Sequence, residues 1–79
     1  MQIKVWALFF DENGKNHCGS DWALEFEGIG EHTLTMRILR KDIARPKDAK
    51  GFIILSDYQF FNYSYEWIER LYKKYGKAL

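Results

Sequence analysis

Residues 3–10, IKVWALFF, decide the fold of this chain because they predict a β-strand that is apolar on both faces. Alternate side chains of a strand point to opposite sides. One side carries Ile3, Val5, Ala7 and Phe9, and the other carries Trp6, Leu8 and Phe10. Such a strand needs cover on both sides, either from the rest of the chain or from a partner.

The residues after this strand predict a hairpin. Asn13-Gly14 is a strong signal for a two-residue turn, because both turn positions require a positive φ. A two-residue turn pairs Val5 with Trp22, so that residues 21–27 form a second strand with its apolar side chains on the inner face with Val5. Residues 16–20 are weak strand material, and an irregular stretch there would break this register.

Two more strands are predicted from the apolar pattern. Residues 32–39 alternate in polarity after a glycine-rich turn, and a loop of three to five residues keeps their apolar side chains on the same inner face. Residues 51–55 form a short strand that is apolar on both faces. This fourth strand pairs either with the first strand or with the third.

The C-terminal third predicts a helix over about residues 57–75, with its apolar side chains in one stripe. Ser56 and Gln59 form a capping-box signature at its start. A start nearer to Ser64 is the alternative, because the residues just before and after Ser64 are poor helix formers. The predicted fold is a single α+β domain over residues 1–79. It has a mostly antiparallel ββββα sheet, with strands at about 2–10, 21–27, 32–39 and 51–55, and one helix on the inner face.

With a single helix, the sheet face of Trp6, Leu8 and Phe10 lacks a cover, and we expect it to bind a protein partner. Two alternatives stay open: a homodimer buries this face, or the chain itself covers it, through residues 40–50 or the chain ends. Charged residues near this face and in the segment that follows complete the candidate set. The partner-binding residues are therefore Trp6, Leu8, Phe10, Glu25, Glu27, Arg37, Arg40 and Lys41.

The net charge of +1 conceals an uneven distribution. Residues 1–36 carry six acidic residues against two lysines, whereas residues 37–50 carry six basic residues against two acidic ones. The composition is not the uniformly basic one of a dedicated nucleic-acid binder. The acidic part can mimic phosphates, and the basic segment 37–50 can dock on an acidic protein or track a phosphate backbone.

No motif in the chain predicts catalysis. His17, Cys18, Asp21 and His32 lack the spaced pairs of a zinc site, and no glycine-rich loop precedes a helix as in phosphate-binding motifs. We therefore expect no enzyme activity, no metal and no cofactor. The one cysteine excludes a disulfide within the chain and fits a reducing cytoplasm, and the N-terminal apolar run is too short to span a membrane.

Together these features favour a small, non-enzymatic protein-binding module that acts by occlusion. From size and lack of chemistry alone, the class includes inhibitors of host nucleic-acid-handling or defence complexes that phages or mobile elements encode, of the anti-CRISPR or immunity-protein kind. The alternative is single-stranded nucleic-acid binding through residues 37–50 and the outer-face aromatic side chains.

Overall fold

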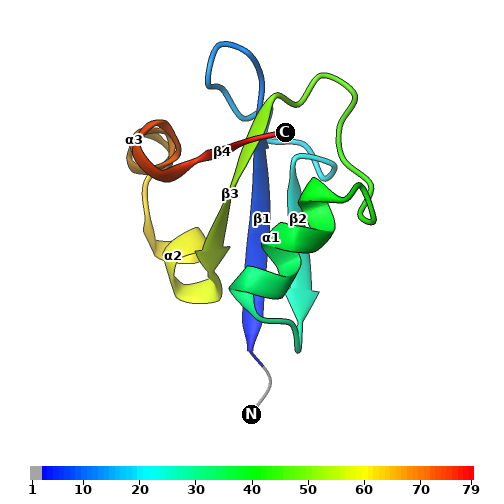
Figure 1. Ribbon diagram of the computed structural model, residues 1–79. Coiled ribbons are helices and arrows are strands. Elements are labelled where there is room, and N and C mark those ends of the chain that lie inside the picture. The colour runs from blue at the N-terminus through cyan, green and yellow to red at the C-terminus, as the bar shows by residue number, and fades with distance from the viewer. Residues whose placement is uncertain (1–2) are drawn as a thin grey trace.

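The computed structural model describes residues 3–79 and contains one four-stranded sheet with helices on both faces (Figure 1). The strands are β1 (Lys4–Phe10), β2 (Ala23–Glu27), β3 (Gly51–Ser56) and β4 (Lys77–Ala78). Their order is β2-β1-β3-β4, and every neighbouring pair is antiparallel. The predicted α+β class with an antiparallel sheet is confirmed. The predicted start of the first strand at residue 2 lies outside the described residues.

β1 lies in the middle of the sheet, as its apolar character on both faces requires. β3, the other strand that is apolar on both faces, pairs with β1 over its whole length, from Val5 opposite Ser56 to Phe10 opposite Gly51. Of the two alternatives for this strand, pairing with the first strand is the one observed.

The register between β1 and β2 differs by four residues from the predicted one. Val5 lies opposite Phe26 rather than Trp22, because residues 11–22 form a long loop in place of a two-residue turn. The side-chain amide of Asn16 donates to the carbonyls of Phe9 and Trp22 at 2.8 and 2.9 Å. These two bonds connect the ends of the two strands through the loop, which therefore does not close as a two-residue turn. The shift is an even number of residues, so the same side chains still share a face.

The predicted strand at residues 32–39 is wrong, because this segment forms α1 (Glu31–Leu39). Leu34 and Ile38 are four residues apart, which suits one helix face as well as it suits alternation in a strand. Both are completely buried against the sheet, and Thr35, which the strand prediction placed on the outside, is also buried, at 8% exposure. The helix is favoured because it covers the inner face of the sheet, together with Ile43 and Ala49 of the segment that follows it and with Leu79.

The predicted single helix over residues 57–75 is two helices, α2 (Asp57–Asn62) and α3 (Tyr65–Tyr75). The capping box is confirmed: Gln59 N–H donates to Ser56 Oγ at 3.1 Å, and Ser56 N–H donates to Gln59 Oε1 at 2.9 Å. Ser64 caps α3 in turn, since its Oγ accepts from Trp67 N–H at 3.1 Å. Both starts considered from the sequence therefore exist, with an extended residue, Tyr63, between the helices.

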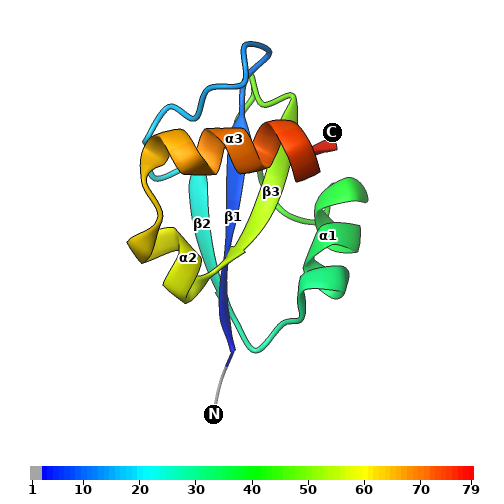
Figure 2. The same ribbon diagram turned by 90° about the vertical axis from the view of Figure 1, so that its left-hand side faces the viewer.

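The helices lie on opposite faces of the sheet, and α3 crosses in front of the strands in Figure 2. α1 packs on the face of Val5, Ala7 and Phe9, whereas α2 and α3 pack on the face of Leu8 and Phe10. The prediction that the C-terminal helix covers the inner face is therefore wrong. The chain covers both faces of its own sheet. Among residues 3–79, no helix combines the length and the apolar character needed to cross a bilayer.

Candidate functional site

The predicted binding patch on the outer sheet face is not exposed. Leu8 and Phe10 retain only 4% and 0% of their accessible surface, because α2 and α3 lie over them. The ring of Phe10 stacks on Tyr72 with ring centroids 4.0 Å apart. The expectation of a partner at this face is corrected for these two residues: the cover comes from the chain itself, through two helices that the prediction placed on the opposite face.

Trp6, the third residue of that patch, is half-buried and belongs to an aromatic stack. Its ring lies 3.9 Å from the ring of Phe60 at an interplanar angle of 8°, and the ring of Phe61 meets it edge-on at 5.6 Å. Its Nε1 donates to Asp57 Oδ1 at 2.9 Å. Trp6 therefore anchors α2 to the sheet and contributes its remaining surface beside the exposed ring of Phe61.

The charged residues of the predicted set do not form one site. Glu25 and Glu27 project from β2 on the side of α2 and α3, where Lys4 Nζ lies 3.7 and 3.6 Å from their carboxylates. These carboxylates, Glu25 first, raise the pKa of Lys4. The basic members Arg37, Arg40 and Lys41 are exposed at the end of α1, which lies on the opposite face.

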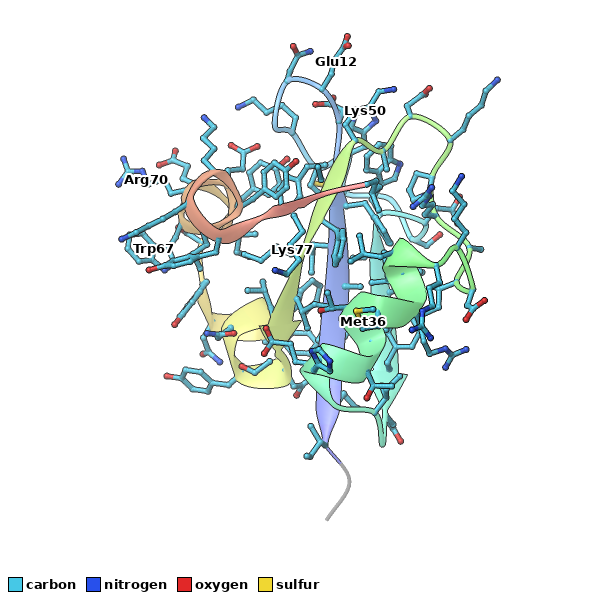
Figure 3. All side chains as sticks on the ribbon, in the orientation of Figure 1. Glu12, Met36, Lys50, Trp67, Arg70 and Lys77 are labelled. Carbon is cyan, nitrogen blue, oxygen red and sulfur yellow. The ribbon has the colours of Figure 1, made fainter. Side chains whose placement is uncertain are left out.

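The structure instead places an aromatic surface on the outside of α2 and α3. We define it as Tyr58, Phe61, Tyr63 and Trp67. Phe61 and Tyr58 are 67% and 71% exposed and lie three residues apart, on one side of α2. Trp67 is 46% exposed and meets the ring of Tyr63 edge-on, with centroids 6.4 Å apart. Figure 3 shows Trp67 and Arg70 on the side of α3 that points away from the sheet.

A hollow of about 300 Å³ adjoins this surface where α2 and α3 meet the loop before β2. Its wall is mostly apolar and includes Phe60 and Tyr63, whereas Asn16 and Cys18 lie among its polar lining residues. An apolar side chain from a partner fits such a hollow when the surrounding aromatic rings exclude water. The aromatic surface therefore combines exposed rings with an adjoining depression.

Partly buried polar contacts hold α3 in position beneath this surface. The Tyr65 hydroxyl donates to the Asn16 carbonyl and accepts from the Asn16 N–H at 3.0 Å. Burial of this hydroxyl raises the pKa of Tyr65 to about 12. Glu69 Oε1 accepts from Lys15 Nζ at 3.2 Å, and Glu69 is 8% exposed. These contacts connect the loop after β1 with the first two turns of α3 and fix the orientation of its outer side.

Within residues 3–79, no three His, Cys, Asp or Glu side chains lie close enough to hold a metal ion. His17 Nε2 instead pairs with Asp11 Oδ2 at 2.7 Å, and its ring stacks on Trp22 at 4.0 Å. This pairing with His17 lowers the pKa of Asp11, helped by the backbone N–H of Lys15. The loop after β1 is thus stabilised by its own polar side chains.

The aromatic surface has a visible signal in the sequence. Six of the ten residues from 58 to 67 are aromatic, and Tyr58 falls outside the apolar stripe of a continuous helix. The signal is hidden as long as residues 57–75 are treated as one helix, because the break at Tyr63 changes which side chains point outward.

A comparison with protein-family models, curated proteins and solved structures finds no match to this chain.

Proposed function

We propose that this chain is a non-enzymatic protein-binding module that acts by occlusion, with the aromatic surface as its contact area. The supporting observation is the exposure of Tyr58, Phe61 and Trp67 in a chain that already covers both faces of its sheet. These rings are not required as cover for the core. Several exposed aromatic side chains on one side of a small domain are typical of an interaction surface.

The local structure makes these rings suitable as anchors. Both helices begin with serine caps, and Phe61 rests against the stacked rings of Trp6 and Phe60, with the ring of Phe60 5.0 Å away. Such rings lose little conformational freedom on binding, which favours affinity. Arg70 follows Trp67 on the outer side of α3 (Figure 3), and tryptophan, tyrosine and arginine are the residue types enriched at binding hot spots.

The alternative, single-stranded nucleic acid bound by basic segment 37–50 and aromatic rings, finds less support. Residues 43 and 49 of that segment pack against the core between the sheet and α1, whereas the aromatic surface lies over the opposite face of the sheet. A single strand has to pass around the border of the sheet to reach both. The narrower prediction, an inhibitor of a host nucleic-acid-handling or defence complex encoded by a phage or mobile element, rests on size and lack of catalytic motifs and stays a prediction.

The test uses a matched pair of tyrosine variants. Tyr58→Ser changes the aromatic surface, and Tyr75→Ser removes a tyrosine of similar exposure, 60% against 71%, at the far end of α3. Each tagged chain is used to capture partners from nuclease-treated lysate, after circular dichroism has shown that both variants fold.

The proposal expects a stoichiometric protein that wild type and Tyr75→Ser retain and that Tyr58→Ser loses. Equal recovery by both variants contradicts the aromatic surface as the contact area. Recovery that disappears with nuclease treatment favours the nucleic-acid alternative.

A further inference from the structure

The backbone of β2 has unpaired hydrogen-bonding groups along its outer edge. Phe9 N–H donates to Trp22 O at 3.0 Å, and Gly28 N–H donates to Ile3 O at 2.8 Å. In an antiparallel pair, the backbone groups of alternate residues point to the same neighbour. The even-numbered residues of β2 therefore bond to β1, and the N–H and C=O groups of Ala23, Glu25 and Glu27 point outward.

Nothing in the described chain pairs with these outward groups. β2 is a border strand (Figure 2), and within residues 3–79 no hydrogen bond from another segment reaches them. The opposite border of the sheet is better protected. β4 pairs with the first two residues of β3, and the N–H of Ser56, the last residue of β3, donates to Gln59 Oε1. The longest unprotected edge of the described sheet is therefore β2.

We propose that the outer edge of β2 binds an extended peptide segment of a partner protein, with basic residues at alternate positions, as an additional strand. Main-chain hydrogen bonds supply the affinity in this mode of recognition, and alternate side chains supply the specificity. This inference does not depend on the aromatic surface, which lies on the helices.

The side chains on the two sides of the β2 edge determine which residues the bound peptide segment needs. On the side of α2 and α3, Glu25 and Glu27 are exposed. Among residues 3–79 they share one cation, that of Lys4, so these three side chains carry a net negative charge. On the other side lies a groove of about 340 Å³, lined by Asp21, Leu24, Ala44, Arg45, Pro46 and Lys47. In a segment that alternates lysine or arginine with small apolar residues, the basic side chains lie beside Glu25 and Glu27. The apolar side chains lie beside the apolar part of the groove, which Leu24, Ala44 and Pro46 form.

A second copy of this chain is the wrong occupant for the same reason. Antiparallel pairing of two β2 strands places Glu25 opposite Glu25 of the copy, or opposite Glu27 when the register shifts one way. When it shifts the other way, Glu27 lies opposite Asp21, which is again a pair of like charges. Like charges directly opposite one another on paired strands are destabilising. The acidic edge therefore selects against self-association and for a basic segment.

The experiment uses the full chain and a fluorescent, acetylated and amidated heptapeptide in which lysine and valine alternate. Glu25→Pro removes the outward N–H at the middle of β2, and border strands tolerate proline where that N–H faces solvent. Glu12→Pro is the matched control with the same charge change. Glu12 is the second residue of the turn closed by Gly14 N–H to Asp11 O at 3.0 Å, where proline is favoured, at the tip of the loop after β1 (Figure 3).

Fluorescence anisotropy is expected to show binding to wild type that weakens about tenfold or more with Glu25→Pro and less than about twofold with Glu12→Pro. A peptide with glutamate in place of lysine, and one N-methylated on its pairing edge, are both expected to bind much more weakly. The N-methylated peptide keeps the test decisive if Glu25→Pro does not fold.

Four results overturn the inference. The first is equal weakening by both proline variants, the second is undiminished binding of the N-methylated peptide, and the third is undiminished binding of the glutamate peptide. A wild-type dimer that Glu25→Pro converts to a monomer also overturns it, in favour of a second copy at this edge.

Discussion

Trp6 Nε1 donates a 2.9 Å hydrogen bond to the carboxylate of Asp57, which joins the central strand to the first residue of α2. The two residues are 51 positions apart in the chain. Asp57 also lies in the first turn of α2, where a negative charge is favoured by the helix dipole. The contact explains how a helix of six residues stays on the sheet, and it converts an apparent binding residue into an anchor of the fold.

We expect Trp6→Phe and Asp57→Ala each to lower the free energy of unfolding by about 1–3 kcal/mol, because hydrogen bonds to charged groups contribute this much. The double variant should lose less than the sum, with a coupling of about 1 kcal/mol. Urea unfolding measures all three, and Asp48→Ala, at an exposed residue of the segment before β3, is the control. Strictly additive losses would show that the bond contributes nothing.

The helix at Glu31–Leu39 is tested by a pair of lysine substitutions. α1 buries Thr35 to 8% exposure and leaves Met36 half-buried, whereas the strand predicted from the sequence pointed Met36 inward and Thr35 outward. Thr35→Lys should therefore cost about 2 kcal/mol or more, because it places a charge against the sheet, and Met36→Lys should cost clearly less. Thermal or urea unfolding measures both losses. A larger loss for Met36→Lys than for Thr35→Lys would contradict the helix and support a strand at these residues.

This segment shows where prediction from sequence is limited. Leu34 and Ile38 fit a strand face and a helix face equally well, and only the packing of the whole sheet decides between them. The central strand, the neighbouring β3 and the capping box were predictable, because each depends on residues close together in the chain.

The candidate site was less predictable than the fold. Trp6, Leu8 and Phe10 were correctly assigned to one sheet face, but their exposure depends on which face the C-terminal helices cover, a long-range property. The register of β2 was missed because Asn16 bonds to two backbone carbonyls at the strand ends, a contact that turn preferences do not encode. The break at Tyr63, and with it the aromatic surface, follows from the second serine cap.

Lys41 follows α1 with a φ of 65°, a left-handed conformation that favours glycine. Its N–H donates to Ile38 O at 3.1 Å and the next N–H, of Asp42, donates to Arg37 O at 3.0 Å, which is the Schellman arrangement. Lys41→Gly should therefore raise the free energy of unfolding by about 0.5–1 kcal/mol, because it relieves the strain of a side chain there.

The control for this gain is Lys47→Gly, which removes the same charge from an exposed residue that has no positive φ. We expect it to be neutral or slightly destabilising in the same urea titration. A gain of equal size at both positions would assign the effect to charge and not to the backbone.

Tyr65 predicts an alkaline dependence of stability. Its pKa is raised from 10.0 to about 12 in the folded chain, so its contribution is complete below pH 10 and is lost as the pH rises through about 12. Tyr65→Phe should lower the free energy of unfolding by about 1–2 kcal/mol at neutral pH, because the two bonds to Asn16 disappear. The difference between wild type and variant should then shrink toward high pH.

Urea unfolding across this pH range, with tyrosinate absorbance as a direct titration, checks the Tyr65 prediction. Tyr58→Phe, at an exposed tyrosine, serves as the control and should leave the pH profile unchanged. A constant difference between wild type and Tyr65→Phe at every pH would contradict the raised pKa as its source.

The most direct test of the binding proposal is the equilibrium affinity of the captured partner, measured by calorimetry at two salt concentrations. Phe61→Ala should weaken binding by about 30-fold, the equivalent of a 2 kcal/mol hot spot, with little dependence on salt. The double variant Arg40→Ala, Lys41→Ala should stay within about twofold of wild type. An unchanged affinity for Phe61→Ala, together with a large, salt-dependent loss for the basic pair, would contradict the aromatic surface as the binding site.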